Sequence, residues 1–301
     1  MKLMTFMKDG VYRTGIKTEE GVLDLAAAVQ NSASGESLPT TVREVIAGGE
    51  SARETVEAFI AQLKIDSPEQ YRANLNHEEE LSIGPCVTDP EKLICIGLNY
   101  RKHAEESNMP IPAYPILFNK FNNTLNGHGS VVPLPRTSNE VDYEAELGIV
   151  IGRTAKYVSE EEALDYVFGY CTANDLSARD LQRRTSQWLA GKSCDGFSPI
   201  GPYLVSADEV GDPNALAISC TVNGELRQNS NTSDMIFNCK QIISYVSHCM
   251  TLKPGDIILT GTPEGVVLGY PPEKRVYLKD GDIVTVSIDK LGALTNHMVS
   301  E

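Results

Sequence analysis

A segment near the middle of the chain, residues 141–151, alternates between apolar and acidic or small side chains. Successive side chains on a strand point to opposite faces, so Asp142, Glu144 and Glu146 share one face and the apolar residues share the other. Such alternation is typical of a strand packed against a core. The chain has 301 residues, 41% of them hydrophobic, which is enough to bury such a strand. This segment therefore predicts a fold built on β-sheet.

Strand signals also dominate the rest of the second part of the chain. Residues 93–98 form a compact apolar run, and Asn223-Gly224 separates two strand-like segments, which is a strong hairpin signal. Fewer segments have helical spacing, and these are residues 160–166, 177–190 and 233–250. We expect an α+β, β-rich main domain over residues 92–301.

The first part of the chain has a different pattern. Residues 1–70 contain three short strand-like runs, followed by helical patterns at 41–47 and 51–64. Residues 71–91 carry several prolines and no periodicity. We expect a small α/β N-terminal domain over residues 1–70 and a linker over residues 71–91.

Charge and composition exclude several classes of protein. The net charge of −15 repels phosphate backbones and anionic membranes, so we expect no nucleic-acid partner. No apolar run is long enough to span a membrane, and the first residues lack the apolar core of a secretion signal. Seven scattered cysteines without a C-x-x-C pair indicate neither a zinc site nor a disulfide framework. These features predict a cytoplasmic protein with no membrane association.

The acidic face of residues 141–151 is a candidate metal site. Neighbouring carboxylates on one face repel each other unless a cation lies between them, and a divalent ion with oxygen ligands is the natural partner. The same pattern also fits the solvated face of an amphipathic strand. The segment alone leaves both interpretations open.

A further acidic position, Asp175, lies between an apolar run and an expected helix. It fits either a residue near a helix N-terminus or a member of an acidic site. Arg179 and Gln182 follow it and are three residues apart, so they would lie on one helical face.

His103 and Glu106 are also three residues apart. A carboxylate beside an imidazole fixes its tautomer and raises its basicity, which makes a general base that can activate water. A polar surface helix gives the same spacing. The segment 260–266 is rich in turn residues and is either a simple turn or a cradle in which Thr262 and backbone N–H groups bind a small carboxylate.

In this order and spacing, the motifs of residues 92–299 resemble the fumarylacetoacetate hydrolase family. The resembling residues are Gly97-Leu98-Asn99-Tyr100 with His103 and Glu106, Pro115–Lys120, Glu144–Gly148, Asp175–Gln182, Lys192 and Gly261–Val266. The small N-terminal segment resembles that of bacterial two-part members.

The resemblance implies a mixed β-roll or sandwich, a homodimer, and one Mg²⁺ or Mn²⁺ per active site. By position, the implied metal ligands are Glu144, Glu146 and Asp175, whereas Asp142 matches no family ligand. The family often has a serine shortly after the lysine that matches Lys120. This chain reads Asn122-Asn123-Thr124 there, which leaves the contacts of the distal part of the substrate open.

The resemblance also implies roles for the other residues. His103, oriented by Glu106, would activate the water that attacks the 4-carbonyl of a 2,4-dioxo acid, and Lys192 would stabilise the developing negative charge. The implied substrate-binding residues are Tyr100, Lys120, Arg179, Gln182 and Thr262. The substrate would be a small 2-oxo acid held through a metal acting as a Lewis acid.

These parts suit more than one reaction. We rank hydrolysis of the C–C bond of acylpyruvates, such as fumarylpyruvate, acetylpyruvate or fumarylacetoacetate, first. Decarboxylation or tautomerisation of oxaloacetate comes next, followed by isomerisation of 2-hydroxymuconate-type diacids. A non-catalytic scaffold stabilised by metal is the alternative from another class of protein.

Overall fold

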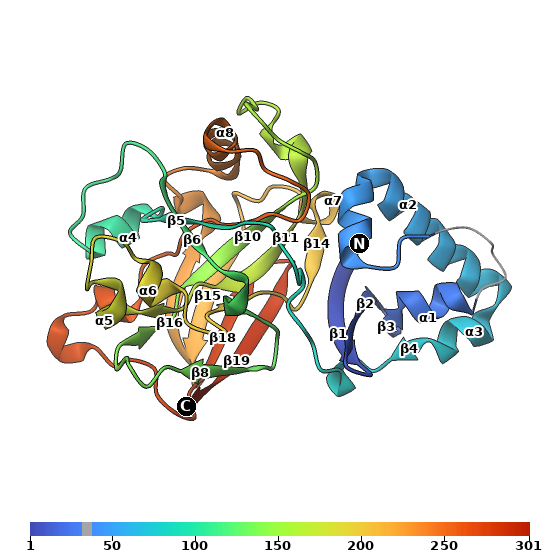
Figure 1. Ribbon diagram of the computed structural model, residues 1–301, viewed down its shortest axis with the longest axis horizontal. Coiled ribbons are helices and arrows are strands. Elements are labelled where there is room, and N and C mark those ends of the chain that lie inside the picture. The colour runs from blue at the N-terminus through green and yellow to red at the C-terminus, as the bar shows by residue number, and fades with distance from the viewer. Residues whose placement is uncertain (32–37) are drawn as a thin grey trace.

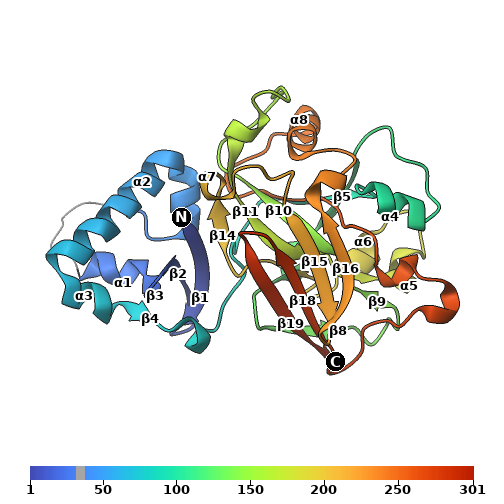
Figure 2. The ribbon, with the colours of Figure 1, turned by 180° about the vertical axis from the view of Figure 1, so that it is seen from behind.

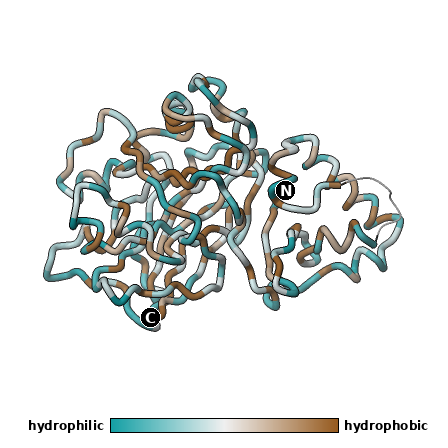
Figure 3. The backbone as a smooth tube through the Cα atoms, in the orientation of Figure 1, coloured by the Kyte–Doolittle hydropathy of each residue, from teal (hydrophilic) through white to brown (hydrophobic). Residues whose placement is uncertain are grey.

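The computed structural model describes residues 1–31 and 38–301. The chain forms a smaller N-terminal part and a larger part that lie side by side, as Figure 1 shows. Figure 3 shows hydrophobic segments running through the interior of the larger part, with hydrophilic loops around its rim. None of the helices in the described ranges combines the length and hydrophobicity that crossing a membrane requires.

One ten-stranded sheet runs through both parts. Its strands, in spatial order, are β4 (Leu75–Asn76), β3 (Gly21–Asp24), β2 (Val11–Thr18), β1 (Lys2–Lys8), β14 (Leu204–Ser206), β11 (Val167–Asn174), β10 (Ala145–Ile151), β17 (Ile257–Leu259), β5 (Leu93–Gly97) and β6 (Ile116–Lys120). The two parts meet where β1 pairs antiparallel with β14, with Leu3 opposite Leu204. The N-terminal strands therefore extend the sheet of the larger part.

The larger part contains a second sheet, which Figure 2 shows from behind. Its five strands, in order, are β16 (Glu225–Asn231), β15 (Ala217–Val222), β18 (Ile283–Ile288), β19 (Gly292–Ser300) and β8 (Val131–Leu134). Buried residues of both sheets, among them Leu147 and Ile149 of β10 and Val286 of β18, belong to one hydrophobic core. The expected β-rich α+β fold is confirmed.

Two further strand pairs are short. They are β12 (Ser177–Ala178) with β9 (Val141–Asp142), and β13 (Ser198–Pro199) with β7 (Leu125–Asn126). The hairpin predicted at Asn223-Gly224 joins β15 to β16, and both residues have the positive φ that such a turn requires.

The helices are mostly short. The α-helices are α1 (Leu25–Gln30), α2 (Val42–Asp66), α3 (Pro68–Ala73), α4 (Arg101–Glu106), α5 (Arg179–Gln182), α6 (Leu189–Lys192), α7 (Ala207–Val210) and α8 (Cys239–Cys249). The 3₁₀ turns are η1 (Glu78–Glu80), η2 (Asn122–Thr124), η3 (Ala163–Tyr166), η4 (Thr232–Asp234), η5 (Val267–Gly269) and η6 (Pro272–Lys274). Helices α4, α5 and α6 lie at the end of the larger part far from the N-terminal part, in both Figure 1 and Figure 2.

The expected helices differ in extent from those of the structure. The helix expected over 233–250 begins only at Cys239, because Asn238 and Gln241 form a capping box there. The helix expected over 177–190 is replaced by the one-turn helices α5 and α6, and only the turn η3 lies within 160–166. In the N-terminal part, α2 covers both expected helical patterns and is kinked at Gly49, where φ is 61°.

Residues 71–91, which we expected to be a linker, make bonds to both parts. Strand β4 pairs with β3, Gly84 N–H donates to Thr5 O at 3.0 Å, and Cys86 N–H donates to Ile200 O at 3.4 Å. The segment is thus a packed connection. The division of the chain near residues 70 and 92 stays a prediction.

Candidate active site

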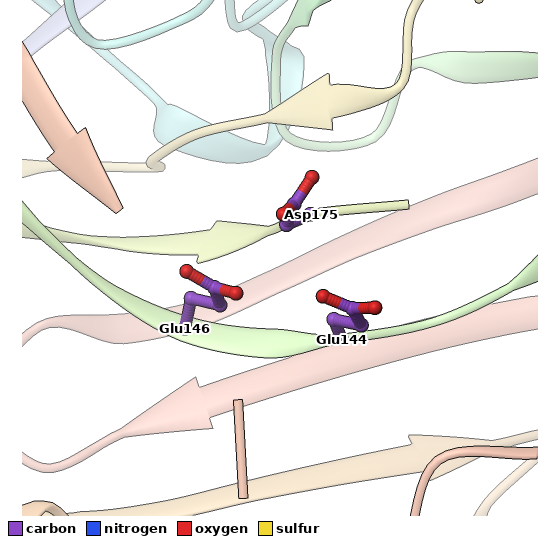
Figure 4. Close-up of side chains that lie close together, drawn as sticks. All are labelled: Glu144, Glu146 and Asp175. Atoms are coloured by element: carbon purple, nitrogen blue, oxygen red, sulfur yellow. The ribbon is translucent and has the colours of Figure 1, made fainter. Parts of the chain in front are cut away.

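Three carboxylates meet where β10 begins and β11 ends. The antiparallel pairing of these strands places Ala145 opposite Asn174, so Glu144 and Asp175 lie side by side, and Asp175 N–H donates to Glu144 O at 2.9 Å. Oxygen atoms of Glu144, Glu146 and Asp175 all lie within 4.8 Å of one another, and Figure 4 shows the three side chains gathered at this point. We call these three residues the carboxylate triad.

The triad is buried. Glu144, Glu146 and Asp175 are 6%, 1% and 0% exposed. The alternative of a solvated strand face is therefore wrong for this segment. The apolar face behaves as expected, because Tyr143, Ala145 and Leu147 belong to the core.

Three cations compensate this buried negative charge. Lys192 Nζ donates to Glu144 Oε2 at 2.8 Å and to Asp175 Oδ2 at 2.7 Å. Arg179 Nη1 lies 2.6 Å from Glu144 Oε1, and Lys120 Nζ donates to Asp175 Oδ1 at 2.6 Å. Because α5 and α6 carry Arg179 and Lys192, these short helices bring cations to the ends of β10 and β11.

The two glutamates of the triad have opposite protonation tendencies. Burial on its own raises the pKa of Glu144, but the charges of Lys192 and Arg179 outweigh it and lower that pKa to about 2. Burial, and then repulsion by Asp175 and Glu144, raises the pKa of Glu146 well above its usual value. Within the described residues, Glu146 forms no ion pair, and its Oε2 accepts a hydrogen bond from Gly261 N–H at 2.8 Å.

The donor set suits a divalent cation. Hard divalent ions prefer carboxylate oxygens, and three of them converge here from two neighbouring strands. Glu144 Oε2 and both Asp175 oxygens each accept one hydrogen bond from a lysine and keep a second lone pair for a metal, whereas Glu144 Oε1 accepts from both Arg179 and Ser177. Glu146 forms no ion pair with a cation among the described residues. A metal ion bound beside the triad would therefore relieve more repulsion at Glu146 than at Glu144 or Asp175. The residues present therefore fit one divalent ion.

A second polar pair, His103 and Glu106, lies on α4. His103 Nδ1 and Glu106 Oε1 are 2.8 Å apart, and the Glu106 oxygens accept hydrogen bonds from Gly265 N–H at 3.1 and 3.2 Å. A carboxylate accepts hydrogen bonds, so Nδ1 carries the proton and Nε2 keeps a free lone pair. The pair is thus arranged as a base, and we call it the His–Glu dyad.

The triad and the dyad meet at one cavity of about 630 Å³. Eight predicted site residues line it: His103, Glu106, Glu144, Glu146, Arg179, Gln182, Lys192 and Thr262. Asp175 lies behind this wall and is joined to it through Lys192.

Two predicted substrate-binding residues do not line the cavity. Lys120 is 3% exposed and donates to Asp175 and to the carbonyl oxygens of Leu176 and Phe197. Tyr100 is fully buried in the core, and its hydroxyl has no hydrogen-bond partner among the described residues. Neither side chain reaches the cavity wall, and direct contact of these two residues with substrate stays a prediction. Lys120 fixes the position of Asp175.

The segment 260–266 is neither a plain turn nor an open cradle. Two of its N–H groups bind protein carboxylates, since Gly261 N–H bonds Glu146 and Gly265 N–H bonds Glu106. The Thr262 hydroxyl accepts from Gln228 Nε2 at 2.8 Å. This segment therefore ties the triad to the dyad.

Sequence reasoning assigned no role to Asp142, which shares the strand face of the triad. Its carboxylate accepts from Arg179 Nε at 2.8 Å and from the N–H groups of Val267 and Leu268 at 2.9 and 3.1 Å. Asp142 thus positions Arg179 and the start of η5. Its place among the acidic residues of 141–151 was the only signal for it.

Other residues of the cavity wall were also missed. They are apolar or lie in loops, and they include Met109, Ile116, Phe118, Trp188, Leu268, Tyr270 and Arg275. Ile116 and Phe118 lie in the Pro115–Lys120 motif but were given no role, and no local pattern marks the others, because they reach the cavity only through the folding of distant segments.

Comparisons with known proteins identify the family of the chain. A model of the fumarylacetoacetate (FAA) hydrolase C-terminal family matches residues 92–299. The match spans more than half of the chain, and the protein belongs to this family.

Similarity to individual proteins extends over nearly the whole chain. Oxaloacetate tautomerase fahd2, mitochondrial, from Xenopus laevis is 44% identical over 292 residues, covering 95% of this chain and 86% of that protein. A solved fumarylacetoacetate hydrolase from Exiguobacterium antarcticum has a TM-score of 0.80 and 32% identity, with 100% of both chains covered. Maleylpyruvate hydrolase from Sphingobium sp. SYK-6, solved with manganese(II) and pyruvate, has a TM-score of 0.78 and 30% identity, covering 100% of this chain and 99% of that one.

Proposed function

We propose that this protein is a divalent-metal-dependent enzyme for keto–enol chemistry of small 2-oxo acids, with tautomerisation of oxaloacetate as its reaction. The observation that carries the proposal is the meeting of the carboxylate triad and the His–Glu dyad at one cavity. The name of the Xenopus laevis relative, at 44% identity, supports oxaloacetate as the substrate.

The first part of the mechanism is substrate binding. Glu144, Glu146 and Asp175 would hold a divalent ion, which would supply a Lewis acid for a bound 2-oxo acid. Arg179 Nη2 is buried without a hydrogen-bond partner among the described residues, and Arg179 lines the cavity. We assign this N–H to a substrate oxygen, because a buried donor without a partner is costly.

The second part is proton transfer. Nδ1 of His103 is held by Glu106, so Nε2 accepts a proton from C3 of the keto form, and the imidazolium then gives this proton to the 2-oxo oxygen to form the enol; the return to the keto form reverses both transfers. The ammonium of Lys192 stabilises the negative charge that builds up on the 2-oxo oxygen when C3 loses its proton. Glu106 stabilises the imidazolium that forms.

Hydrolysis of the C–C bond of acylpyruvates is the second candidate. The same Nε2 lone pair can take a proton from water that attacks a 4-carbonyl, and cleavage leaves the enolate of pyruvate in the same place. The cavity of about 630 Å³ exceeds the space that a four-carbon acid needs. The similarity to maleylpyruvate hydrolase also favours this reaction. Decarboxylation of oxaloacetate and isomerisation of 2-hydroxymuconate-type diacids need the same triad, and we rank both below tautomerisation and C–C bond hydrolysis.

A substrate panel separates these reactions. Metal-free protein is loaded with Mg²⁺ or Mn²⁺, and the decay of enol-oxaloacetate is followed by its ultraviolet absorbance against metal alone. Pyruvate release from acetylpyruvate and fumarylpyruvate is measured in parallel. We expect metal-dependent acceleration of the keto–enol exchange. Pyruvate release without any effect on the exchange would favour the hydrolase, and no metal-dependent activity on any member would favour the scaffold.

Assembly and location stay proposals as well. We propose a homodimer, whose test is the mass in solution by light scattering. We keep the cytoplasm as the proposed location, although the Xenopus laevis relative carries the word mitochondrial in its name. Fractionation of cells that express the tagged chain tests it.

A further inference from the structure

Four side chains of the cavity wall can carry positive charge, and three of them already have an acidic partner. Arg179 and Lys192 bind the triad, and His103 binds Glu106. The fourth, Arg275, lines the same cavity. Among residues 1–31 and 38–301, no ion pair within 4.0 Å involves Arg275, so its guanidinium is an uncompensated charge at the cavity.

The loop around Arg275 fixes the direction of its side chain. Its Nε donates to the carbonyl oxygen of Tyr270 at 2.9 Å, five residues earlier in the chain. Pro271 and Pro272 lie between them, and proline restricts the backbone of such a loop. With Nε engaged, the two terminal nitrogens form the free edge of the guanidinium, which matches the two oxygens of a carboxylate.

The surroundings of Arg275 strengthen the electrostatic interactions that its guanidinium can make. The nearby wall includes Leu268 and Tyr270, and Ile116, Phe118 and Trp188 add further apolar surface to the cavity. Charge interactions are stronger beside apolar walls than in water. Arg275 itself is half-buried, and it lies beyond ion-pair distance of the triad carboxylates. Its guanidinium is therefore available to a carboxylate of the substrate.

We propose that Arg275 is a specificity-determining residue that binds a second carboxylate of the substrate, at the end opposite the 2-oxo acid group. The site would then prefer 2-oxo diacids to 2-oxo monoacids of equal length. The inference rests on the proposed function, because it takes the 2-oxo acid end to be bound at the triad. It adds the residue that would bind the second carboxylate, which oxaloacetate and longer 2-oxo diacids share.

Binding of matched ligands tests the inference without depending on which reaction occurs. The probes are two pairs of equal chain length, 2-oxoglutarate with 2-oxopentanoate and 2-oxoadipate with 2-oxohexanoate. Trp188 is the single tryptophan of the chain and lines the cavity, so its fluorescence in the Mn²⁺-loaded protein reports binding. The variants are Arg275→Gln, which removes the charge, and Arg275→Lys, which keeps the charge without the two-pronged edge.

Lys274→Gln is the matched control. Lys274 is exposed, neighbours Arg275 in the same loop and is absent from the cavity wall, so its substitution removes the same charge without touching the site. We expect Arg275→Gln to raise the Kd of at least one diacid about tenfold or more and to change the Kd of the matched monoacid less than twofold. The Kd of Arg275→Lys for the diacid should lie between those of the wild type and Arg275→Gln. The Kd values of Lys274→Gln should match those of the wild type.

The outcomes separate this inference from the proposed function. If the wild type binds both ligand classes equally, or Arg275→Gln weakens both equally, the role of Arg275 is refuted while the 2-oxo acid site stands. If neither class binds the Mn²⁺-loaded wild type, the proposed function fails and the inference fails with it.

Discussion

Glu144, which directly precedes β10, and Glu146, which lies on it, differ in protonation because of their neighbours. Glu144 faces Lys192 and Arg179, which lower its pKa to about 2 against the effect of burial. Burial and the repulsion of Asp175 and Glu144 raise the pKa of Glu146. A bound divalent ion replaces that repulsion by attraction, so the ionised form of Glu146 becomes the stable one.

Metal binding should therefore release a proton from Glu146. The metal-free carboxyl holds a proton at a pH where an ordinary glutamate has lost it, so Mn²⁺ affinity should rise with pH until that raised pKa is passed. Calorimetry of Mn²⁺ binding in two buffers with different ionisation enthalpies measures the number of protons released. Glu146→Gln should bind Mn²⁺ much more weakly and release no proton. A heat of binding that is the same in both buffers would contradict this account.

Loss of the imidazole should affect turnover far more than metal binding. His103 contacts Glu106 and not the triad, so His103→Asn should lower kcat by about 10²–10⁴-fold, the usual contribution of a general base. Its Kd for Mn²⁺ should stay close to that of the wild type. His297→Asn, an exposed site on β19, is the control. Equal activity of the two variants would remove His103 from the mechanism.

At the scale of elements, the segment 260–266 connects the two halves of the site. Gly261 has φ of 99° and Gly265 has φ of 98°, which favour glycine. A Cβ at Gly265 would lie 2.2 Å from the carbonyl oxygen of Arg227, so backbone would have to move. Gly265 therefore packs closely on Arg227 in the same place where its N–H donates to Glu106.

Alanine at Gly265 should therefore damage both stability and activity. We expect Gly265→Ala to cost about 3 kcal/mol or more in unfolding free energy, together with a fall in kcat as Glu106 loses its N–H donor. Gly255→Ala is the matched control, with φ of 88° and no atom within 4 Å of the added Cβ. It should cost only the ~1–2 kcal/mol of left-handed backbone. Thermal unfolding and turnover of both variants measure this, and equal losses would mean that the close approach does not matter.

Several elements were visible in the sequence because their signals are local. Alternation marked β10, and Asn223-Gly224 marked the hairpin between β15 and β16. The start of α8 was missed by six residues, because the apolar spacing continues upstream while the capping pair of Asn238 and Gln241 sets the boundary. The helix expected over 177–190 is replaced by α5 and α6, and each of these short helices carries one cation, Arg179 or Lys192, that contacts the triad.

At the scale of the whole molecule, the N-terminal part and the larger part share one sheet. Leu3 of β1 is fully buried and belongs to the same hydrophobic cluster as Val150 and Ile257 of the larger part. Such sharing makes the two parts unfold together.

Leu3→Ala should thus destabilise the entire chain. Loss of a buried leucine side chain costs about 2–5 kcal/mol. Trp188 lies far from this substitution, in the larger part, so its fluorescence reports whether the effect spreads. We expect the midpoints from Trp188 fluorescence and from circular dichroism to fall together. A lowered midpoint in circular dichroism with an unchanged one in Trp188 fluorescence would show that the parts unfold separately.

Long-range arrangement is what the sequence could not supply. The triad and the dyad were foreseen because their members lie within short motifs that resemble a known family. The pairing of β1 with β14 joins residues about two hundred positions apart, and no local pattern encodes it. Arg275, Trp188 and the buried positions of Tyr100 and Lys120 depend on the same distant packing.

The most direct test of the account is one titration of metal-free protein with Mn²⁺ that records bound metal and oxaloacetate keto–enol exchange together. We predict one Mn²⁺ per chain, activity that rises in proportion to occupancy, and loss of both in the double variant Glu144→Gln/Glu146→Gln. Exchange activity that is independent of Mn²⁺, or tight Mn²⁺ binding that survives in the double variant, would contradict the account.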